Sequence, residues 1–248
     1  MFATTSPREL RRLVSEFAGD DRAGVQALVQ KARNAIALHS AERRRLRAMA
    51  EVERSLREDG SRVVAGLDEV GRGALAGPVT VAAVVLPPDA VIEGLNDSKL
   101  LDPTARERMA EEIRAVAQAL FVAHAAAHII DAIGISAAIR GAMEHAIVRL
   151  PARPDHVVTD GRPFGLSVPE TAIVRGDSSV AAIAAASIVA KVERDTVMRR
   201  LAASYPQWSF ESNKGYGTSE HIAAISARGL SIVHRRSFAP CGGQSTLF

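Results

Sequence analysis

The sequence predicts an α/β fold, in which helices cover a β-sheet. Short apolar runs rich in β-branched residues, such as residues 79–86, have the composition of buried strands. Longer stretches with helical spacing, such as residues 131–149, separate these runs. Several runs end in carboxylates, and the end of a strand is where sheets of this kind bind ligands. We therefore expect a helix-covered sheet with a polar site along one edge.

The length and composition are sufficient for a sizeable core. The chain has 248 residues, of which 47% are hydrophobic. The single cysteine, Cys241, excludes a disulfide framework within the chain and argues against a cysteine metal site. The first residues lack a signal-peptide pattern, and no apolar run reaches the roughly 18 residues that a membrane span needs. We expect a cytoplasmic monomer with no membrane partner.

The positive charge is unevenly distributed. The net charge is +3, and residues 1–60 carry all of it, with 12 Lys and Arg against 9 Asp and Glu. Residues 61–248 are formally neutral, with 19 residues of each sign. If several of those acids bind metal ions, the remaining surface is effectively basic, which favours a polyanionic partner.

Residues 1–60 are predicted to form a charged, helical N-terminal extension. One helix begins at Ser6-Pro7, a second segment begins near Asp20, and a third runs to about Glu58. The third segment carries the basic cluster 43–47, which either contacts nucleic acid or forms a solvated helix face. Gly60 marks the boundary to the core.

The remaining elements alternate along the chain. Strands are expected at residues 63–67, 79–86, 119–125, 156–160 and 172–174. Helices are expected at residues 103–118, 131–149, 177–204 and 219–228. Residues 239–248 are expected to form a flexible tail.

Two adjacent carboxylates, Asp68 and Glu69, end the first strand. Two ionised carboxylates repel each other, and burial makes each harder to ionise. A divalent cation removes both problems and prefers oxygen ligands. The alternative interpretation is a surface turn with ordinary charges.

Asp160 and Asp177 repeat this pattern, because each follows a short apolar run and lies beside a glycine. Four carboxylates without a cysteine or histidine cluster favour Mg²⁺ or Mn²⁺ over zinc. Two such ions are common machinery for in-line displacement at phosphorus. For Asp177 the alternative is capping of the helix that begins there.

Basic and aromatic residues near glycines suggest how a phosphodiester substrate would be held. The loop 71–73 is Gly-Arg-Gly, whose backbone can approach a ligand closely and whose arginine suits phosphate. Lys99 follows a polar turn. Tyr216 lies between glycines, where it either stacks on a sugar or base or plugs the edge of the core.

The long helix 177–204 carries several cations. Lys191 closely follows the buried, small-residue face of this helix. Arg194, Arg199 and Arg200 are expected to form a solvated helix face.

Residues 66–79, with the sequence GLDEVGRGALAGPV, resemble the signature of ribonuclease HII, the type 2 ribonuclease H family. Arg72 between two glycines separates the chain from the related ribonuclease HIII group. The resemblance covers about residues 62–238, so residues 61–238 are expected to be the catalytic domain. Further matching motifs follow in family order at residues 97–99, 159–161, 176–178, 185–192, 214–218 and 234–238.

The resemblance implies a ribonuclease H-like fold, with a mixed five-stranded sheet, helices on both faces and a C-terminal helical part. It implies an endoribonuclease that hydrolyses the RNA strand of RNA–DNA hybrids. It also implies incision on the 5′ side of a single ribonucleotide in duplex DNA, leaving 3′-hydroxyl and 5′-phosphate ends. Two Mg²⁺ or Mn²⁺ ions are the implied cofactors.

The resemblance also assigns roles to residues. The Gly71-Arg72-Gly73 loop would read the 2′-hydroxyl, largely through backbone groups, and Tyr216 would stack on the sugar of the following deoxynucleotide. Lys99 would contact phosphate, with Ser98 and Lys191 as further substrate-binding residues. The catalytic, metal-binding acids would be Asp68, Glu69, Asp160 and Asp177.

The C-terminal residues 244–248 resemble the short peptide by which bacterial replication and repair enzymes dock on the DNA sliding clamp. A flexible tether would present two apolar anchors to a pocket on the clamp. The clamp-binding residues would be Gln244, Leu247 and Phe248.

Three other functions remain open from the residues themselves. Another two-metal nuclease or strand-transferase would cut without regard to ribose. A non-catalytic nucleic-acid-binding protein would have lost an acid, and all four are present here. A phosphatase of small substrates is disfavoured by the loop 71–73 and by Tyr216.

Overall fold

The computed structural model describes residues 6–242. The chain divides into two compact units, one of residues 1–49 with 91–94 and the other of residues 50–90 with 95–248. Each unit is described by itself below.

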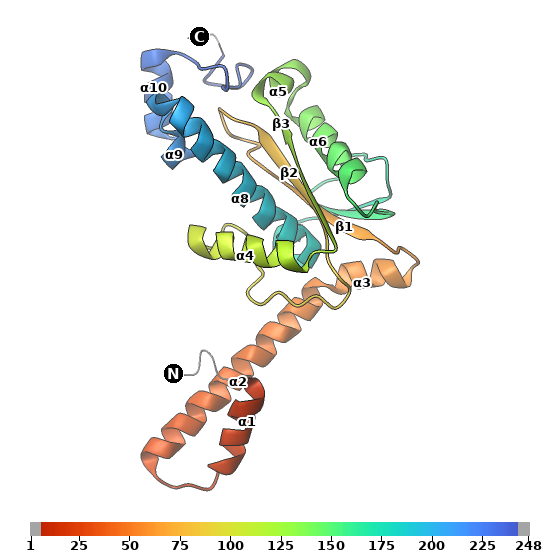
Figure 1. Cartoon of the computed structure of the whole chain (residues 1–248), viewed down its shortest axis with the longest axis vertical. Helices are drawn as coiled ribbons and strands as arrows, with labels where there is room; N and C mark the ends of the chain where they lie inside the picture. Colours follow the sequence, from red (N-terminus) through yellow and green to blue (C-terminus); the bar gives the residue numbers. More distant parts are fainter. Residues whose placement is uncertain (1–5, 243–248) are drawn as a thin grey trace. The chain divides into compact units, whose positions relative to one another are not determined.

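The second unit is built on a mixed five-stranded sheet in the order β3-β2-β1-β4-β5 (Figure 1). Strand β1 pairs antiparallel with β2 and parallel with β4, while β3 and β5 extend the two sides. This arrangement confirms the predicted fold class. The strands are β1 (Val64–Val70), β2 (Val79–Val85), β3 (Ala119–Ala125), β4 (His156–Asp160) and β5 (Glu170–Ile173).

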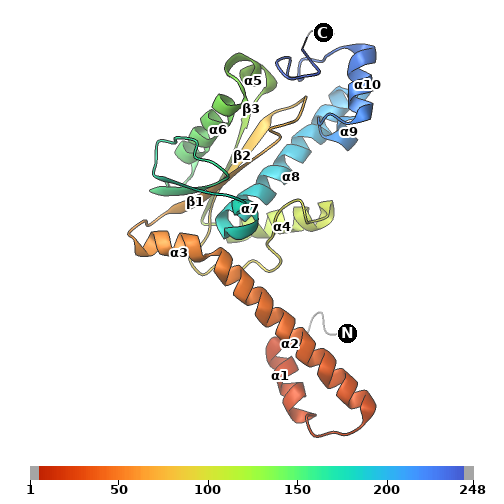
Figure 2. The same cartoon turned by 180° about the vertical axis from the view of Figure 1, so that it is seen from behind.

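Helices cover both faces of this sheet (Figures 1 and 2). Helices α5 (Ala127–Ile133) and α6 (Ile135–Arg149) pack on one face, and α8 (Ala181–Ser204) packs on the other, with α4 (Pro103–Val116) against it. Successive residues of β1 point to opposite faces, as the strand period requires. Leu67 therefore joins the core beneath α6, whereas Val64 joins the cluster beside the start of α8.

The predicted C-terminal helical part follows α8. It consists of the 3₁₀ turn η1 (Pro206–Trp208), α9 (Phe210–Asn213) and α10 (Ser219–Arg228). These elements enclose a separate apolar cluster around Trp208 and Phe210. This cluster anchors the loop between α9 and α10, which carries Tyr216.

Helix α3 (Glu51–Glu58) also belongs to the second unit. Its Glu53 is buried, and one carboxylate oxygen accepts the backbone N–H of Ala182 in the first turn of α8, at 2.8 Å. Burial raises the pKa of Glu53 above its ordinary value. Helix α3 is thus tied to the start of α8, which packs on the sheet.

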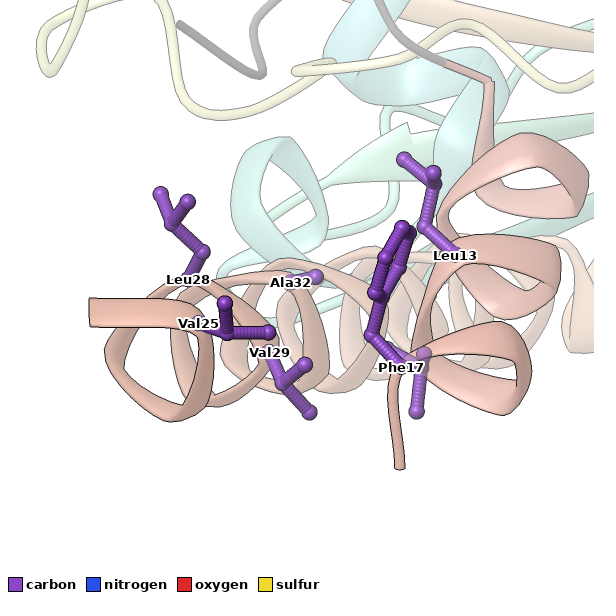
Figure 3. A pocket seen from close by; sticks show the side chains of 7 residues that line it. Leu13, Phe17, Val25, Leu28, Val29 and Ala32 are labelled. Carbon is purple, nitrogen blue, oxygen red and sulfur yellow. The ribbon is translucent and has the colours of Figure 1, made fainter. Parts of the chain in front are cut away.

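In the first unit, α1 (Pro7–Glu16) lies alongside α2 (Ala23–Met49). Ser6 and Glu9 cap the start of α1 reciprocally. The basic cluster 43–47 lies within α2. The prediction that it belongs to a separate, third helical segment is therefore wrong. An apolar pocket opens between the two helices (Figure 3). Its lining residues are Leu13, Val14, Phe17, Val25, Leu28, Val29 and Ala32.

Two predicted helices are interrupted. Residues 131–149 do not form one helix, because Gly134 adopts φ +82° between α5 and α6. The helix predicted over residues 177–204 is also broken. Val180 is extended, and it separates the short α7 (Gly176–Ser179) from α8. Across residues 6–242, no helix has both the length and the apolar composition needed to cross a membrane.

Candidate active site

Four carboxylates meet at one edge of the sheet. Strands β1 and β4 are parallel, and their register pairs Leu67 with Thr159, so Asp68 and Asp160 are the next residues on neighbouring strands. Glu69 follows on β1, and Asp177 comes from α7. One cleft collects all four acids together with Ser98, Lys99, Lys191 and Tyr216, and we call it the acid cleft. Its lining is completed by Val70 and Ser187.

The electrostatics of Asp68 reflect crowding and burial. Its side chain is almost fully buried, and it accepts the backbone N–H of Glu69 at 2.8 Å. Burial, followed by the charge of Glu69, raises the pKa of Asp68 well above its ordinary value, although a hydrogen bond with Ser187 opposes the rise. Burial also raises the pKa of Glu69, despite the Arg72 guanidinium at 3.3 Å. The cleft therefore holds more negative charge than its own cations balance.

The other two acids have local partners. Lys99 Nζ donates to Asp177 at 2.8 Å, and this contact raises the pKa of Lys99. Asp160 accepts the backbone N–H of Gly176 at 2.7 Å. Asp177 does not cap the long helix, because it lies within α7 and the residue at the start of α8 is Val180.

The donor chemistry of the cleft fits a hard divalent cation, since oxygen is the only donor type among the four acids. Within the described range 6–242, no three acidic, histidine or cysteine side chains are arranged as they stand to hold a metal ion. The Lys99 ammonium pairs with Asp177, where a metal ion would otherwise bind this carboxylate. Mg²⁺ or Mn²⁺ therefore suits the acid cleft, with rotation of side chains needed to close a site.

Of the predicted substrate-binding residues, Lys99 is the most exposed cation in the cleft, with 75% of its side chain accessible. Lys191 instead donates to Asp195 at 2.7 Å. The Ser98 hydroxyl is buried and lies 3.0 Å from the Ser187 hydroxyl. Tyr216 is half-buried and lines the cleft. Its ring is therefore neither fully exposed for stacking nor fully enclosed in the core.

Arg194 is the main residue that the sequence interpretation misplaced. It is fully buried, whereas a solvated face was expected, and it donates to the carbonyl oxygens of Ala76, Pro78 and Lys214 at 2.9 to 3.1 Å. Its guanidinium also lies 5.1 Å from the Tyr216 ring centroid. A signal was available, because Arg194 continues the buried stripe of α8 at helical spacing, four residues before the buried Met198.

Arg235 holds the same loop from a second side. It donates to the carbonyl oxygens of Arg72 at 3.0 Å and Gly77 at 3.1 Å, and burial lowers its pKa to about 10. Gly71 adopts φ +87°, and a Cβ atom there would lie 2.1 Å from Nε of Arg194. Only glycine fits at this position, so the loop 71–78 is shaped by the two buried arginines.

A chain of buried polar groups supports Tyr216. His221 Nδ1 lies 2.9 Å from the Tyr216 carbonyl oxygen, and its Nε2 lies 3.0 Å from Nε2 of His234. The other ring nitrogen of His234 lies 2.7 Å from the Ser231 hydroxyl. Burial lowers the pKa of both histidines, that of His234 to about 4. The neutral pair fixes the main chain at Tyr216.

The predicted clamp-binding residues Gln244, Leu247 and Phe248 lie outside the described residues.

Family comparisons cover both parts of the chain. Residues 65–241 match the model of ribonuclease HII, and residues 1–57 match the model of the ribonuclease HII N-terminal domain. A ribonuclease HII of Bacillus cereus is 45% identical over 221 residues, which cover 89% of this chain and 86% of that protein.

Solved structures share the fold. Ribonuclease H2 from Pyrococcus horikoshii superposes with a TM-score of 0.63 at 24% identity, covering 72% of this chain and 95% of its own. The ribonuclease HII in the PCNA complex from Archaeoglobus fulgidus gives 0.60 at 24% identity, covering 71% and 95%. Bst-RNase HIII in complex with Mn²⁺ gives 0.54 at 19% identity, covering 67% and 63%.

Proposed function

This chain belongs to the ribonuclease HII family, and from that premise we propose that it is an endoribonuclease acting on RNA–DNA hybrids. We further propose that it incises duplex DNA on the 5′ side of a single embedded ribonucleotide, leaving 3′-hydroxyl and 5′-phosphate ends. The observation that carries the proposal is the meeting of four carboxylates with Lys99 and Tyr216 in one cleft.

The catalytic residues of this proposal are the four acids. Asp68, Glu69, Asp160 and Asp177 would hold two Mg²⁺ or Mn²⁺ ions, a choice supported by the Mn²⁺ complex of the related Bst-RNase HIII. Bound ions of this kind supply an activated water and stabilise the leaving oxygen. Burial, and after it the charge of neighbouring acids, raises the pKa of Asp68 and of Glu69. A bound cation would offset both effects, which favours cation binding.

Lys99 is proposed to bind a phosphate of the substrate. Its ammonium pairs with Asp177 in the absence of substrate, and its exposed side chain can turn from that carboxylate to a phosphate oxygen. Ser98 and Lys191 are proposed to complete this side of the cleft. Lys191 would first have to leave Asp195.

The ribose would be recognised by a loop and a ring that share one support. Backbone groups of the loop 71–73 would read the 2′-hydroxyl, and Tyr216 would stack on the sugar of the next deoxynucleotide. Arg194 contacts carbonyl oxygens on both sides, in the 71–78 segment and at Lys214. The loop 71–73 and the Tyr216 ring would therefore keep a constant separation, which suits detection of an RNA-to-DNA junction.

The test is cleavage of a labelled DNA duplex that contains one ribonucleotide, beside an all-DNA duplex, with Mg²⁺ or with Mn²⁺. One cut on the 5′ side of the ribonucleotide, in the first duplex only, is the expected result. Cutting of both duplexes would retain a metal-dependent nuclease and refute 2′-hydroxyl recognition. Binding without cutting, with either metal, would refute the enzymatic assignment in favour of a non-catalytic binding protein.

The proposed cellular role is removal of ribonucleotides from DNA by a monomer in the cytoplasm. The division into a helical extension of residues 1–60, a catalytic domain of residues 61–238 and a tail of residues 239–248 stays a prediction. The extension has no assigned chemistry.

A second partner is proposed for residues 244–248. The complex of Archaeoglobus fulgidus ribonuclease HII with PCNA supports a clamp contact through the proposed anchors Leu247 and Phe248. Deleting residues 244–248 should abolish binding to the bacterial clamp and leave cleavage of a short duplex unchanged. Clamp binding that survives the deletion would refute this role for the tail.

A further inference from the structure

A second cleft adjoins the acid cleft at Glu69 and Asp160, the two residues that line both. We call it the arginine cleft, because it also contains Arg72, Arg140 and Arg162. Tyr216, Lys99 and Asp177 line only the acid cleft. The shared acids therefore form the border between two differently charged grooves. The arginine cleft is completed by Ser136, Ala137, Gly161, Pro163 and Phe164.

The charges of the arginine cleft are only partly compensated. Arg72 pairs with Glu69 at 3.3 Å. Arg140, on α6, and Arg162, two residues after Asp160, are exposed, and their side chains form no hydrogen bond or ion pair with any residue of the described range 6–242. Exposed arginines without an acidic partner, beside a catalytic border, fit an anionic ligand supplied from outside.

The loop that carries Arg162 is held in place. The Glu170 carboxylate accepts the backbone N–H groups of Phe164 at 3.0 Å and Gly165 at 3.1 Å. Glu144 of α6 accepts the N–H of Ser167 at 2.7 Å, which ties the end of the loop to the helix that carries Arg140. The two guanidinium groups are thus presented by segments joined to each other, so little ordering is needed when a ligand binds.

We propose that Arg140 and Arg162 bind the phosphodiester backbone of the cleaved strand on the 5′ side of the cut. This inference rests on the proposed function, in which Tyr216 stacks on the nucleotide that follows the ribonucleotide. The 3′ part of the strand then occupies the acid cleft, and the scissile phosphate lies at the shared acids. The strand continues from that border into the arginine cleft, and this part is 5′ of the cut.

Guanidinium groups suit this task because they bind phosphate oxygens in pairs without reading bases. Contacts of this kind would let the enzyme hold any flanking DNA sequence. They would also require several nucleotides on the 5′ side of the ribonucleotide for full affinity.

The experiment measures binding of full-length protein to a duplex with one ribonucleotide, in EDTA so that no cleavage occurs, at several salt concentrations. The variants are Arg140→Gln, Arg162→Gln and the double variant. Arg153→Gln is the matched control, because Arg153 is also exposed but precedes β4, at the opposite end of that strand from Asp160. Each cleft variant should reduce the slope of log Kd against log salt by about 1, and the double variant by about 2. The control should match the wild type.

Neutral methylphosphonate linkages locate the contacts. Placed one to three linkages 5′ of the ribonucleotide, they should weaken binding of the wild type about tenfold, and should weaken the double variant much less. Placed on the 3′ side, they should weaken both proteins equally. Unchanged salt slopes in the cleft variants, or equal losses for both proteins at the 5′ positions, would overturn the inference.

The outcomes separate this inference from the proposed function. Failure of the wild type to cut at the ribonucleotide would refute the function. A wild type that cuts correctly, with cleft variants that bind like Arg153→Gln, would refute only the strand path.

Discussion

Two regions of the catalytic unit bury charge of one sign, and they balance it differently. The acid cleft gathers Asp68, Glu69, Asp160 and Asp177, and Lys99 is the cation that pairs with Asp177 there. The arginine pair, Arg194 and Arg235, is fully buried and forms no ion pair within residues 6–242. Its partners are carbonyl oxygens of the backbone.

This difference suggests that the acid cleft binds a ligand, whereas the arginine pair positions the main chain. Backbone carbonyl oxygens accept hydrogen bonds from both arginines, although the buried Nη2 of Arg235 has no partner within residues 6–242. These bonds hold the loop 71–78 and the segment of Tyr216 in place. The acid cleft is only partly compensated, and burial together with the charge of Glu69 raises the pKa of Asp68. A buried charge that the protein leaves unbalanced points to a ligand, whereas one that it balances points to architecture.

The largest expected effect is loss of activity on neutralising an acid. Asp68→Asn should lower turnover about a thousandfold or more, because a metal ligand is lost. Duplex binding should persist. The free energy of unfolding without metal, at neutral pH, should rise, because the cost of burying this carboxylate disappears. Urea denaturation in EDTA measures this free energy. A large loss of stability would contradict the view that the buried charge of Asp68 is only partly compensated.

Neutralising an arginine should have the opposite effect on stability. Arg194→Met removes the donor from three carbonyl oxygens and should lower the free energy of unfolding by about 3 kcal/mol. Arg199→Met is the control on the same helix, since Arg199 is only half-buried and pairs with Glu107 at 3.2 Å. Its cost should stay below about 1 kcal/mol. Equal losses in the two variants would mean that the buried hydrogen bonds of Arg194 contribute no more stability than the surface ion pair of Arg199.

The third prediction tests the ring that Arg194 supports. Tyr216→Ala should lower kcat/KM for a single embedded ribonucleotide about tenfold, the value of one stacking contact. Long RNA–DNA hybrids, in which every nucleotide offers a 2′-hydroxyl, should lose less. Competition between the two substrates in one reaction measures the ratio directly. Identical losses on both would argue against junction sensing.

The smallest effect concerns pH. In the folded protein the pKa of His234 is about 4, below its ordinary value of 6.5, so the unfolded chain takes up a proton first as the pH falls. This histidine therefore leaves stability unaffected above pH 6.5 and reduces it progressively down to about 4. Between pH 7 and 5.5 the loss should be about 1 kcal/mol. A His234→Asn variant should show a flatter profile, and an unchanged profile would assign the sensitivity to other groups.

The sequence was informative where side chains carry the signal. The β-branched runs predicted the sheet, and the acids at the ends of β1 and β4 predicted the cleft that collects them. Arg194 was misplaced because its partners are backbone carbonyl oxygens. Every residue has one, so the sequence does not indicate which of them an arginine binds. Without a visible acidic partner, an arginine is assigned to solvent by default.

Helix boundaries failed for a related reason. Helical spacing of apolar residues runs through Gly134, but the backbone there turns to a positive φ, and periodicity does not report this. Conversely, the basic cluster 43–47 suggested a separate segment, although nothing in it interrupts a helix. The sequence did not predict a binding role for Arg140 or Arg162, because neither lies in a recognisable motif.

The arginine clamp on the loop 71–78 also has a consequence for protein synthesis. The arginine donors to this loop lie 116 to 163 residues later in the chain than the carbonyl groups they bind. A ribosome that adds about 5–20 residues per second needs roughly 8–30 s to travel from Gly71 to Arg235. Just before Arg235 is made, the nascent chain already contains Asp68, Glu69 and Asp160 but lacks one of the two arginines that hold the loop beside them. A partly made chain at the ribosome therefore lacks the full arginine clamp on this loop until translation is nearly complete.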